Sequence, residues 1–419
     1  MSREFQTPPN HPSINRSETQ RATGCMVGAA VGDALGAPFE FRGPNEYAMA
    51  FPRPALGGTG EMIGGGSFGW APGEFTDDTQ MAIALAHALL DAGRWDADTV
   101  WNWFRAWAAT ANDVGVTTAT ALAHADWRAV PKGGKSGAGN GALMRAFPLA
   151  VAYLFADADT ARSVVVEQAA LTHPDPAAGW GAWIAVELCR LAIRGEDPFA
   201  YLDTIVGELP DDVRGRFAEM LSPQWTPDLP HVTNGSVWGC LAEAVWAVRN
   251  TSNFHDAVVA AINLGGDTDT VACVAGALAG ALYGVQAIPS RWTTYLNGNL
   301  DTPSGSPLRM RTADLLALTR RLLGLGEPSE EPAEYTVEPK EVAPGLYACN
   351  YPGAAGVPTD WAVVVHCHGG RSRTGLVLKA WKMRAHGASE REAHDWLADQ
   401  WPLYEDYNRT FVEFLRTDW

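Results

Sequence analysis

Basic side chains are scarce in this chain of 419 residues, in which 31 Lys and Arg stand against 48 Asp and Glu and the formal net charge is −17. A surface with this much negative charge repels nucleic acid phosphates and anionic membranes, and it attracts cations. We therefore expect no nucleic acid partner and no membrane partner. Divalent metal ions fit this charge.

Cysteines are few and scattered. The six, at positions 25, 189, 240, 273, 349 and 367, include no C-x-x-C pair, which argues against a disulfide framework or a zinc site. Residues 1–20 lack the apolar core of a signal peptide, and no run of ~18 apolar residues indicates a membrane span rather than a buried helix. We expect a soluble, cytoplasmic, monomeric protein.

Apolar residues are plentiful, at 47% of the chain with 17 Trp, which is enough for a large core. We expect residues 1–19 to be a disordered arm and residues 20–325 to be an all-α domain. In this domain Ala, Leu and Trp recur at helical spacing, alternating strands are absent, and Gly, Pro and Asp occupy the connections. The clearest predicted helices are 81–92, 97–110, 179–194, 237–248 and 255–263.

The composition changes after residue 325. Residues 326–342 are rich in Pro and Glu, which is typical of a linker. Residues 343–419 predict a small α/β unit, with strands at 346–350 and 361–366 and helices at 375–386 and 389–400.

Three glycines near the start of the helical domain, Gly24, Gly28 and Gly32, are spaced four apart. Each costs a helix about 1 kcal/mol relative to Ala, so a stripe of them favours a very close helix–helix crossing. Asp33 follows and either caps a turn or binds a metal through water. Glu40 falls in the loop that leaves this helix.

Two acidic clusters each precede an apolar helix. One reading is helix N-capping. However, each cluster holds two carboxylates, which repel one another without a cation, and neither contains Lys or Arg. All-oxygen ligands suit hard cations such as Mg²⁺, Mn²⁺ or Ca²⁺, and two metals ~3.5–4 Å apart are typical of hydrolytic centres. We predict that the clusters meet in space. Their members are Thr76, Asp77, Asp78, Asp267, Asp269 and Thr270.

Three connecting segments carry weaker signals. Residues 136–145 form a glycine-rich loop whose backbone N–H groups could hold a phosphate, the alternative being a plain loop. Residues 112–115 form a turn that contains Asp113. His173, in a turn at 171–175, is either a structural residue or part of a pocket.

In chain order, the segments GAAVGDALGAPFE, GEFTDDTQMA, NDVGVTT, GAGNGALMRAFPLA, LTHPDP and INLGGDTDTVACVAGALAGALYG resemble the ADP-ribosylglycohydrolase family. The resemblance implies an all-α fold, two divalent cations (Mg²⁺ or Mn²⁺), and an ADP-ribosylated protein or another ADP-ribose conjugate as partner. It implies hydrolysis of the N- or O-glycosidic bond through an oxocarbenium-like transition state. A non-enzymatic ADP-ribose-binding module is the alternative.

Carried over by position, the resemblance makes the six cluster residues metal ligands. It places Glu40 in a mobile loop over the site and Asp113 near the ribose. Catalytic roles are expected for Glu40, Asp113 and Asp269, and which carboxylate is the base stays open. The substrate-binding residues that the resemblance implies are Gly137, Gly139, Asn140, Gly141, Met144 and His173.

A second motif, H-C-x-x-G-x-x-R-T-G, contains Cys367, Gly370, Arg373 and Thr374. It resembles the phosphate loop of dual-specificity and tyrosine phosphatases, in which a Cys at a helix N-terminus is the nucleophile. The nearest Asp, at position 360, lies ~20 Å away along the strand, so a general acid is missing. Three alternatives stay open: a phosphate-binding remnant, an active phosphatase, and phosphatase chemistry as the main activity.

Overall fold

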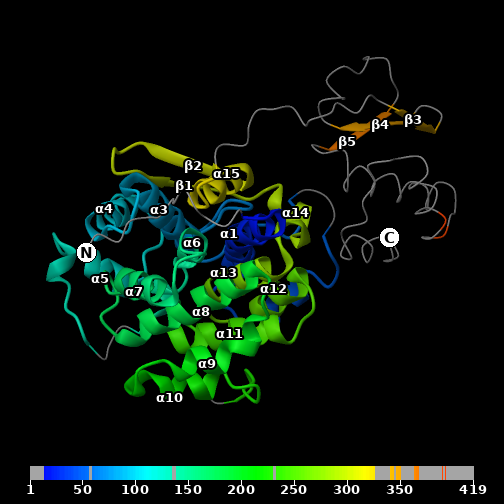
Figure 1. Cartoon of the computed structure of the whole chain (residues 1–419). Coiled ribbons are helices and arrows are strands. Elements are labelled where there is room, and N and C mark those ends of the chain that lie inside the picture. Colours follow the sequence, from blue (N-terminus) through cyan, green and yellow to red (C-terminus); the bar gives the residue numbers. More distant parts are fainter. Residues whose placement is uncertain are drawn as a thin grey trace. The chain divides into compact units, whose positions relative to one another are not determined.

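The computed structural model describes residues 14–55, 59–134, 138–229 and 233–325, and beyond these 340–343, 346–350, 363–367, Ser389 and Glu392. The chain divides into two units, Met1–Glu327 and Pro328–Trp419, which we describe separately. The first unit is mostly helical (Figure 1). No helix in the described segments combines the length and apolarity needed to cross a bilayer.

The first unit is built around two antiparallel helices, α1 (Arg16–Gly36) and α13 (Thr268–Tyr283). A Cβ added to Gly28 would lie 2.3 Å from the Gly276 carbonyl oxygen, and one added to Gly32 would lie 1.9 Å from that of Ala272. The predicted close crossing is therefore confirmed. It brings the end of α1, with Asp33, beside the start of α13, with Asp269.

Further helices surround this pair (Figure 1). The predicted ones are present with small shifts: α3 (Asp77–Ala92), α4 (Ala97–Ala108), α8 (Pro176–Arg194), α11 (Val237–Arg249) and α12 (Phe254–Ile262). The others are α2 (Glu46–Ala50), α5 (Val116–Leu122), α6 (Phe147–Ala152), α7 (Ala158–Ala169), α9 (Leu202–Gly207), α10 (Asp211–Met220), α14 (Ser290–Thr293) and α15 (Thr312–Leu322). Short 3₁₀ turns are η1 (Ala37–Phe39), η2 (Trp127–Ala129), η3 (Asn140–Ala142), η4 (Pro198–Tyr201) and η5 (Val285–Ala287).

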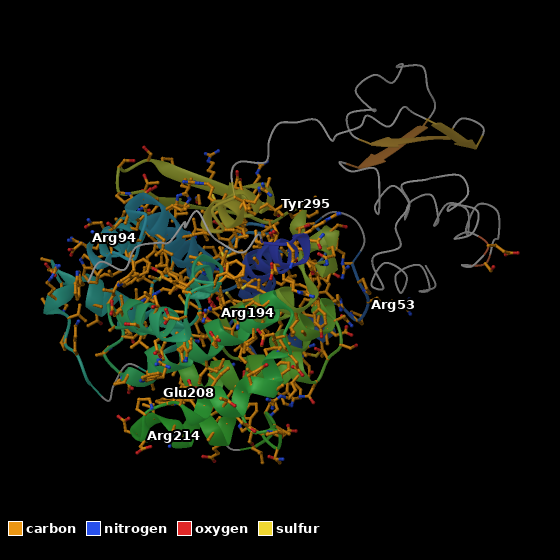
Figure 2. The ribbon with its side chains drawn as sticks, viewed as in Figure 1. Arg53, Arg94, Arg194, Glu208, Arg214 and Tyr295 are labelled. Carbon is orange, nitrogen blue, oxygen red and sulfur yellow. The ribbon has the colours of Figure 1, made fainter. Side chains whose placement is uncertain are left out.

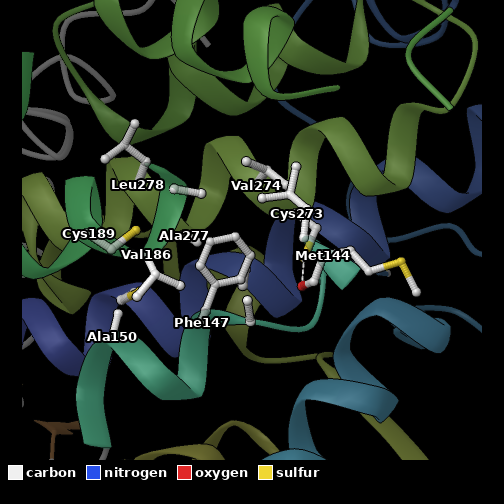
Figure 3. Close-up of a cluster of buried hydrophobic side chains, with 14 of the residues drawn as sticks. Met144, Phe147, Ala150, Val186, Cys189, Cys273, Val274, Ala277 and Leu278 are labelled. Atoms are coloured by element: carbon white, nitrogen blue, oxygen red, sulfur yellow. Dashed lines mark hydrogen bonds between the residues drawn. The ribbon is translucent and has the colours of Figure 1, made fainter. Parts of the chain in front are cut away.

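The core joins α6, α8 and α13. Figure 3 shows Phe147 and Ala150 of α6 in one buried cluster with Val186 of α8 and Ala277 of α13. Cys189 and Cys273 are buried in this cluster as free thiols.

Two boundaries of the first unit differ from expectation. Helix α1 begins at Arg16, inside the segment 1–19 predicted to be a disordered arm, because Asn15 and Glu18 form a reciprocal capping box. The domain is also not purely helical, since strands β1 (Asn297–Asp301) and β2 (Pro307–Arg311) pair antiparallel beside α15 (Figure 1). These strands are short and polar, so they lack the apolar alternation that marks a strand in sequence.

The second unit contains strands β3 (Lys340–Ala343), β4 (Leu346–Asn350) and β5 (Val363–Cys367) in the order β3-β4-β5. Strand β4 matches its prediction and β5 corresponds to the predicted 361–366, but β3 begins inside the predicted linker 326–342. Strands β4 and β5 are parallel, with Asn350 opposite Cys367. Gly370, Arg373, Thr374 and nearly all of the two predicted helices lie outside the described residues.

Candidate metal and substrate site

Helix α3 receives its N-terminal cap from another helix. The buried carboxylate of Asp33 on α1 accepts hydrogen bonds from the Thr76 amide at 2.9 and 3.0 Å and from the Thr79 amide at 3.1 Å. Burial raises the pKa of Asp33 to about 6, although these bonds oppose the shift. Since Asp33 takes the capping role, Asp77 and Asp78 are not needed as caps, and the capping interpretation of the first cluster is wrong.

The two clusters meet, as the sequence predicted. Oδ2 of Asp78 on α3 accepts hydrogen bonds from the Thr76 hydroxyl at 3.2 Å and from the Thr270 hydroxyl of α13 at 3.5 Å. Oδ1 of Asp78 is buried and has no hydrogen-bond partner among the described residues. The first turns of α3 and α13 therefore present carboxylate and hydroxyl oxygens to a common point.

Glu40 lies with the second cluster. Carboxylate oxygens of Glu40, Asp267 and Asp269 lie within 4.8 Å of one another, and Glu40 Oε2 is buried without a partner in the described chain. The loop that carries Glu40 is held in place by the backbone N–H of Phe41, which donates to the Gly266 carbonyl at 2.6 Å. The resemblance placed Glu40 over the site, whereas the structure places it among the predicted metal ligands.

Two asparagines orient Asp267. The side-chain amide of Asn140 donates to Asp267 Oδ2 at 2.7 Å and to the Asn234 backbone carbonyl at 3.0 Å. Asn234 accepts from the Asp267 amide at 3.1 Å and donates at 2.8 Å to both Glu243 and the Gly265 carbonyl. Asn234 was not predicted as a site residue, because in the sequence it forms part of an ordinary Asn-Gly turn. The buried Glu243, alone in an apolar helix, was the available signal.

We call the set Glu40, Asp77, Asp78, Asp113, Asp267 and Asp269 the acidic cluster. Burial, reinforced by Asp267 and Asp113, raises the pKa of Glu40 to about 8. Burial and Asp267 raise the pKa of Asp113 to about 6. The pKa values of Asp77, Asp78 and Asp269 also lie well above the usual range, because these groups are buried among other carboxylates.

Positive side chains lie elsewhere. In the described residues, no Lys or Arg forms an ion pair with the acidic cluster, and labelled residues such as Arg94 and Arg214 pair with Asp96 and Asp211 at the surface (Figure 2). A buried negative cluster of this kind needs a cation. All of its possible metal-ligating atoms are oxygens, and two of them have no hydrogen-bond partner in the described chain. Such oxygens fit hard divalent cations such as Mg²⁺ or Mn²⁺.

The glycine-rich loop lies against His173. A Cβ on Gly141 would meet the His173 ring at 3.1 Å. The loop also contacts the turn that contains Asn234, because the backbone N–H of Asn140 donates to the Gly235 carbonyl at 3.2 Å. Gly139 also faces the ring, whereas Gly137 lies outside the described residues. The side chain of Met144 is buried in the core, and its carbonyl accepts from Cys273 Sγ at 3.7 Å (Figure 3).

His173 is a buried neutral imidazole. Burial lowers its pKa to about 3, with a smaller effect of Arg145. The Thr172 hydroxyl accepts from Arg145 Nη2 at 2.8 Å and so has its proton free for His173 Nδ1, also at 2.8 Å. The ring proton is then on Nε2, the nitrogen nearest Gly139 and Gly141.

Comparisons with known proteins point to one family. A model of the ADP-ribosylglycohydrolase family matches residues 15–332. ADP-ribosylarginine hydrolase Tri1 of Serratia proteamaculans is 34% identical over 67% of this chain and 76% of its own. ADP-ribosyl-[dinitrogen reductase] glycohydrolase of Rhodospirillum rubrum is 32% identical over 73% and 98%.

A solved structure titled ADP-ribosylglycohydrolase-related protein complex superposes with a TM-score of 0.57 at 31% identity, covering 74% of this chain and 99% of the matched one. The family model ends at residue 332, near the boundary between the two units, so it describes the first unit. Residues 15–332 identify the chain as a member of the ADP-ribosylglycohydrolase family, whose members hydrolyse glycosyl bonds.

Proposed function

We propose that this protein removes ADP-ribose from a modified protein side chain by hydrolysis that depends on two divalent cations, Mg²⁺ or Mn²⁺. The observation that carries the proposal is the convergence of two distant oxygen clusters, with Asp78 Oδ1 and Glu40 Oε2 buried and unpartnered. The residues that would hold the cations are Thr76, Asp77, Asp78, Asp267, Asp269 and Thr270, with Glu40 beside them.

The acceptor we propose is arginine. The relatives named above include an ADP-ribosylarginine hydrolase at 34% identity, aligned over 67% of this chain. The bond to be cleaved then joins the anomeric carbon of the ribose to a guanidinium nitrogen. A bound divalent cation would supply Lewis-acid stabilisation of ribose and water oxygens.

Side chains of the site would orient Asp267 and accept a proton from the attacking water. Asn140 and Asn234 hold Asp267 in one orientation. Asp113, half-buried and close enough to Asp267 to feel its charge, is a candidate to take the proton of the attacking water. Glu40 is the second candidate, because its Oε2 has no other partner in the described residues.

The glycine-rich loop would bind the diphosphate. Gly139 and Gly141 carry no side chains of their own and lie beside His173, whose neutral ring would donate through Nε2. The walls of the acidic cluster repel phosphate, which favours binding of the diphosphate at this loop.

The test is release of ADP-ribose from mono-ADP-ribosyl-arginine and -serine proteins, with Mg²⁺, Mn²⁺ or EDTA. The double variant Asp267→Ala/Asp269→Ala is compared with Cys367→Ser as the matched control. Release that needs metal, is lost in the aspartate variant and persists in the cysteine variant supports the proposal. A folded wild type that binds ADP-ribose and releases none from either substrate would identify a binding module instead.

The C-terminal unit supports a second candidate function, phosphate binding. Cys367 stands at the carboxyl end of β5, a strand parallel to β4, and ligands commonly bind at that edge of parallel sheets. We propose that the loop with Gly370, Arg373 and Thr374 binds a phosphate there. Phosphate protection of Cys367 from alkylation, lost in Arg373→Ala, is the expected result; alkylation that is equal with and without phosphate contradicts it.

A further inference from the structure

A cavity of about 170 Å³ opens beside the acidic cluster, between the start of α3, the end of α4 and strand β1. Its lining includes Gln80, one helical turn beyond Asp77 on α3, and Asn112, the residue before Asp113. Asp113 lies close enough to Asp77 that its charge helps to raise the pKa of Asp77. The cavity therefore lies near Asp77 and Asp113, and the family resemblance places Asp113 near the ribose.

The lining is acidic and contains no basic side chain. Glu74 and Asp301 contribute carboxylates, and the Asp301 carboxylate forms no hydrogen bond or ion pair with any described residue. One oxygen of Glu74 accepts from the Ala71 amide at 2.7 Å. These carboxylates oppose the entry of the ADP-ribose diphosphate and favour a cation.

A second observation points to a ligand in the same cavity. Gln80 is only 5% exposed, and its amide oxygen accepts from Trp107 Nε1 at 2.8 Å. Its NH₂ end is bonded to no described residue. This donor is accessible from the cavity, where a ligand or water can accept from it. The cavity thus offers two carboxylates to a cation and one donor to an oxygen atom.

We propose that this cavity is the acceptor subsite, with Glu74 and Asp301 holding the guanidinium of the modified arginine and Gln80 donating to a carbonyl oxygen of the same peptide. This deepens the proposed function and rests on it. A planar guanidinium suits paired carboxylates because it donates in a fork.

The subsite also has a chemical role. When the C–N bond breaks, its electron pair stays on nitrogen, and a guanidinium leaves as neutral guanidine. The water oxygen bonds to the anomeric carbon, and the proton that it loses restores the guanidinium charge. The guanidinium is cationic at neutral pH, so it leaves as guanidine without a general acid, and the carboxylates bind and orient it for this step. An O-linked serine gains nothing from this arrangement, so the subsite selects arginine.

The test compares wild type with Glu74→Gln/Asp301→Asn on ADP-ribosyl-arginine and ADP-ribosyl-serine peptides, with free ADP-ribose binding measured alongside. Asp211→Asn is the matched control, because this side chain is 91% exposed on α10. We expect kcat/KM for the arginine substrate to fall about 10- to 100-fold in the double variant. The Kd of ADP-ribose, activity on serine and the control should not change.

Two outcomes overturn the inference: an unchanged kcat/KM for the arginine substrate, or an equal loss of both substrates together with ADP-ribose binding. A wild type that releases ADP-ribose from neither peptide would instead contradict the proposed function. The cavity is then judged by affinity for the ADP-ribosyl-arginine peptide. Affinity that the double variant weakens relative to free ADP-ribose upholds the subsite, and equal affinity rejects it.

Discussion

The helical unit contains two sites with buried charged side chains, and they differ in whether these side chains have hydrogen-bond partners. Arg145 is fully buried, and its guanidinium donates to Gln168 at 3.0 and 3.1 Å and to Thr172 at 2.8 Å. The acidic cluster instead has carboxylates facing one another, with Glu40 Oε2 and Asp78 Oδ1 unpartnered in the described chain. The first arrangement needs no ligand to be stable. The second does, and this difference separates a structural network from a binding site.

The largest effect expected from this comparison is loss of activity without loss of fold. Asp78→Asn removes a negative charge from the first turn of α3, where the carboxylate accepts from Thr76 and Thr270. We expect activity to fall by more than the roughly 100-fold that loss of a residue supporting a metal ligand causes. In EDTA the variant should unfold at the same or a higher temperature, because repulsion within the cluster is reduced.

The measurement is ADP-ribose release with Mg²⁺, paired with thermal unfolding in EDTA. Asp211→Asn serves as the surface control. A marked drop in the unfolding temperature of metal-free Asp78→Asn would show that this carboxylate stabilises the fold by itself. Asp78 would then act as a structural residue, as Arg145 does, and not only as a binding residue.

The opposite result is expected at Arg145. Arg145→Met keeps most of the side-chain volume but leaves Gln168 and Thr172 without their donor. We expect the free energy of unfolding to fall by about 3 kcal/mol, equally with and without metal, since charged hydrogen bonds are lost inside the core. Urea denaturation in Mg²⁺ and in EDTA measures this. A loss seen only with metal would place Arg145 in the binding site.

A smaller effect is expected at the asparagines that orient Asp267. Asn140→Ala and Asn234→Ala each remove a bond to Asp267, of 2.7 and 3.1 Å respectively. We expect metal affinity to weaken roughly 10- to 100-fold, as happens when a residue that orients a ligand is lost. Titration with Mn²⁺ measures it, and the exposed Asn250→Ala is the control. Unchanged affinity would assign both amides to loop structure alone.

The sequence predicted the parts of this site that rest on local chemistry. The glycine stripe and the helices follow from patterns a few residues long, and the meeting of Asp78 with Thr270 was inferred because both clusters carry carboxylates that call for a shared cation. Long-range contacts without such paired motifs were not predictable. Asp33 caps α3 from 43 positions away, and Asn234 supports Asp267 across 33. The hairpin β1–β2 and strand β3 were missed because short strands in polar segments carry no periodic apolar signal.

The smallest effect, and the one that tests the sign of the electrostatics, is the pH dependence of the metal-free protein. The pKa of Glu40 is raised to about 8 by burial and by Asp267 and Asp113, so the folded protein holds a proton that the unfolded chain releases near its ordinary value of 4.5. Its contribution to stability is fully present below that value and is lost as pH rises through 8. For His173 the sign is reversed, because its pKa is lowered to about 3 and its contribution is lost as pH falls below 6.5.

Thermal unfolding in EDTA between pH 4.5 and 8.5 should therefore show a decline that is shallower in Glu40→Gln, and the difference between the two curves isolates this carboxyl group. Mg²⁺ should flatten the wild-type curve, since bound cations replace the protons that neutralise the cluster. His173→Gln should change only the acid side of the profile. If the wild type and Glu40→Gln give parallel curves in EDTA, Glu40 is ionised in the folded protein without metal. The cluster then tolerates its own charge, and the contrast with the Arg145 network does not extend to Glu40.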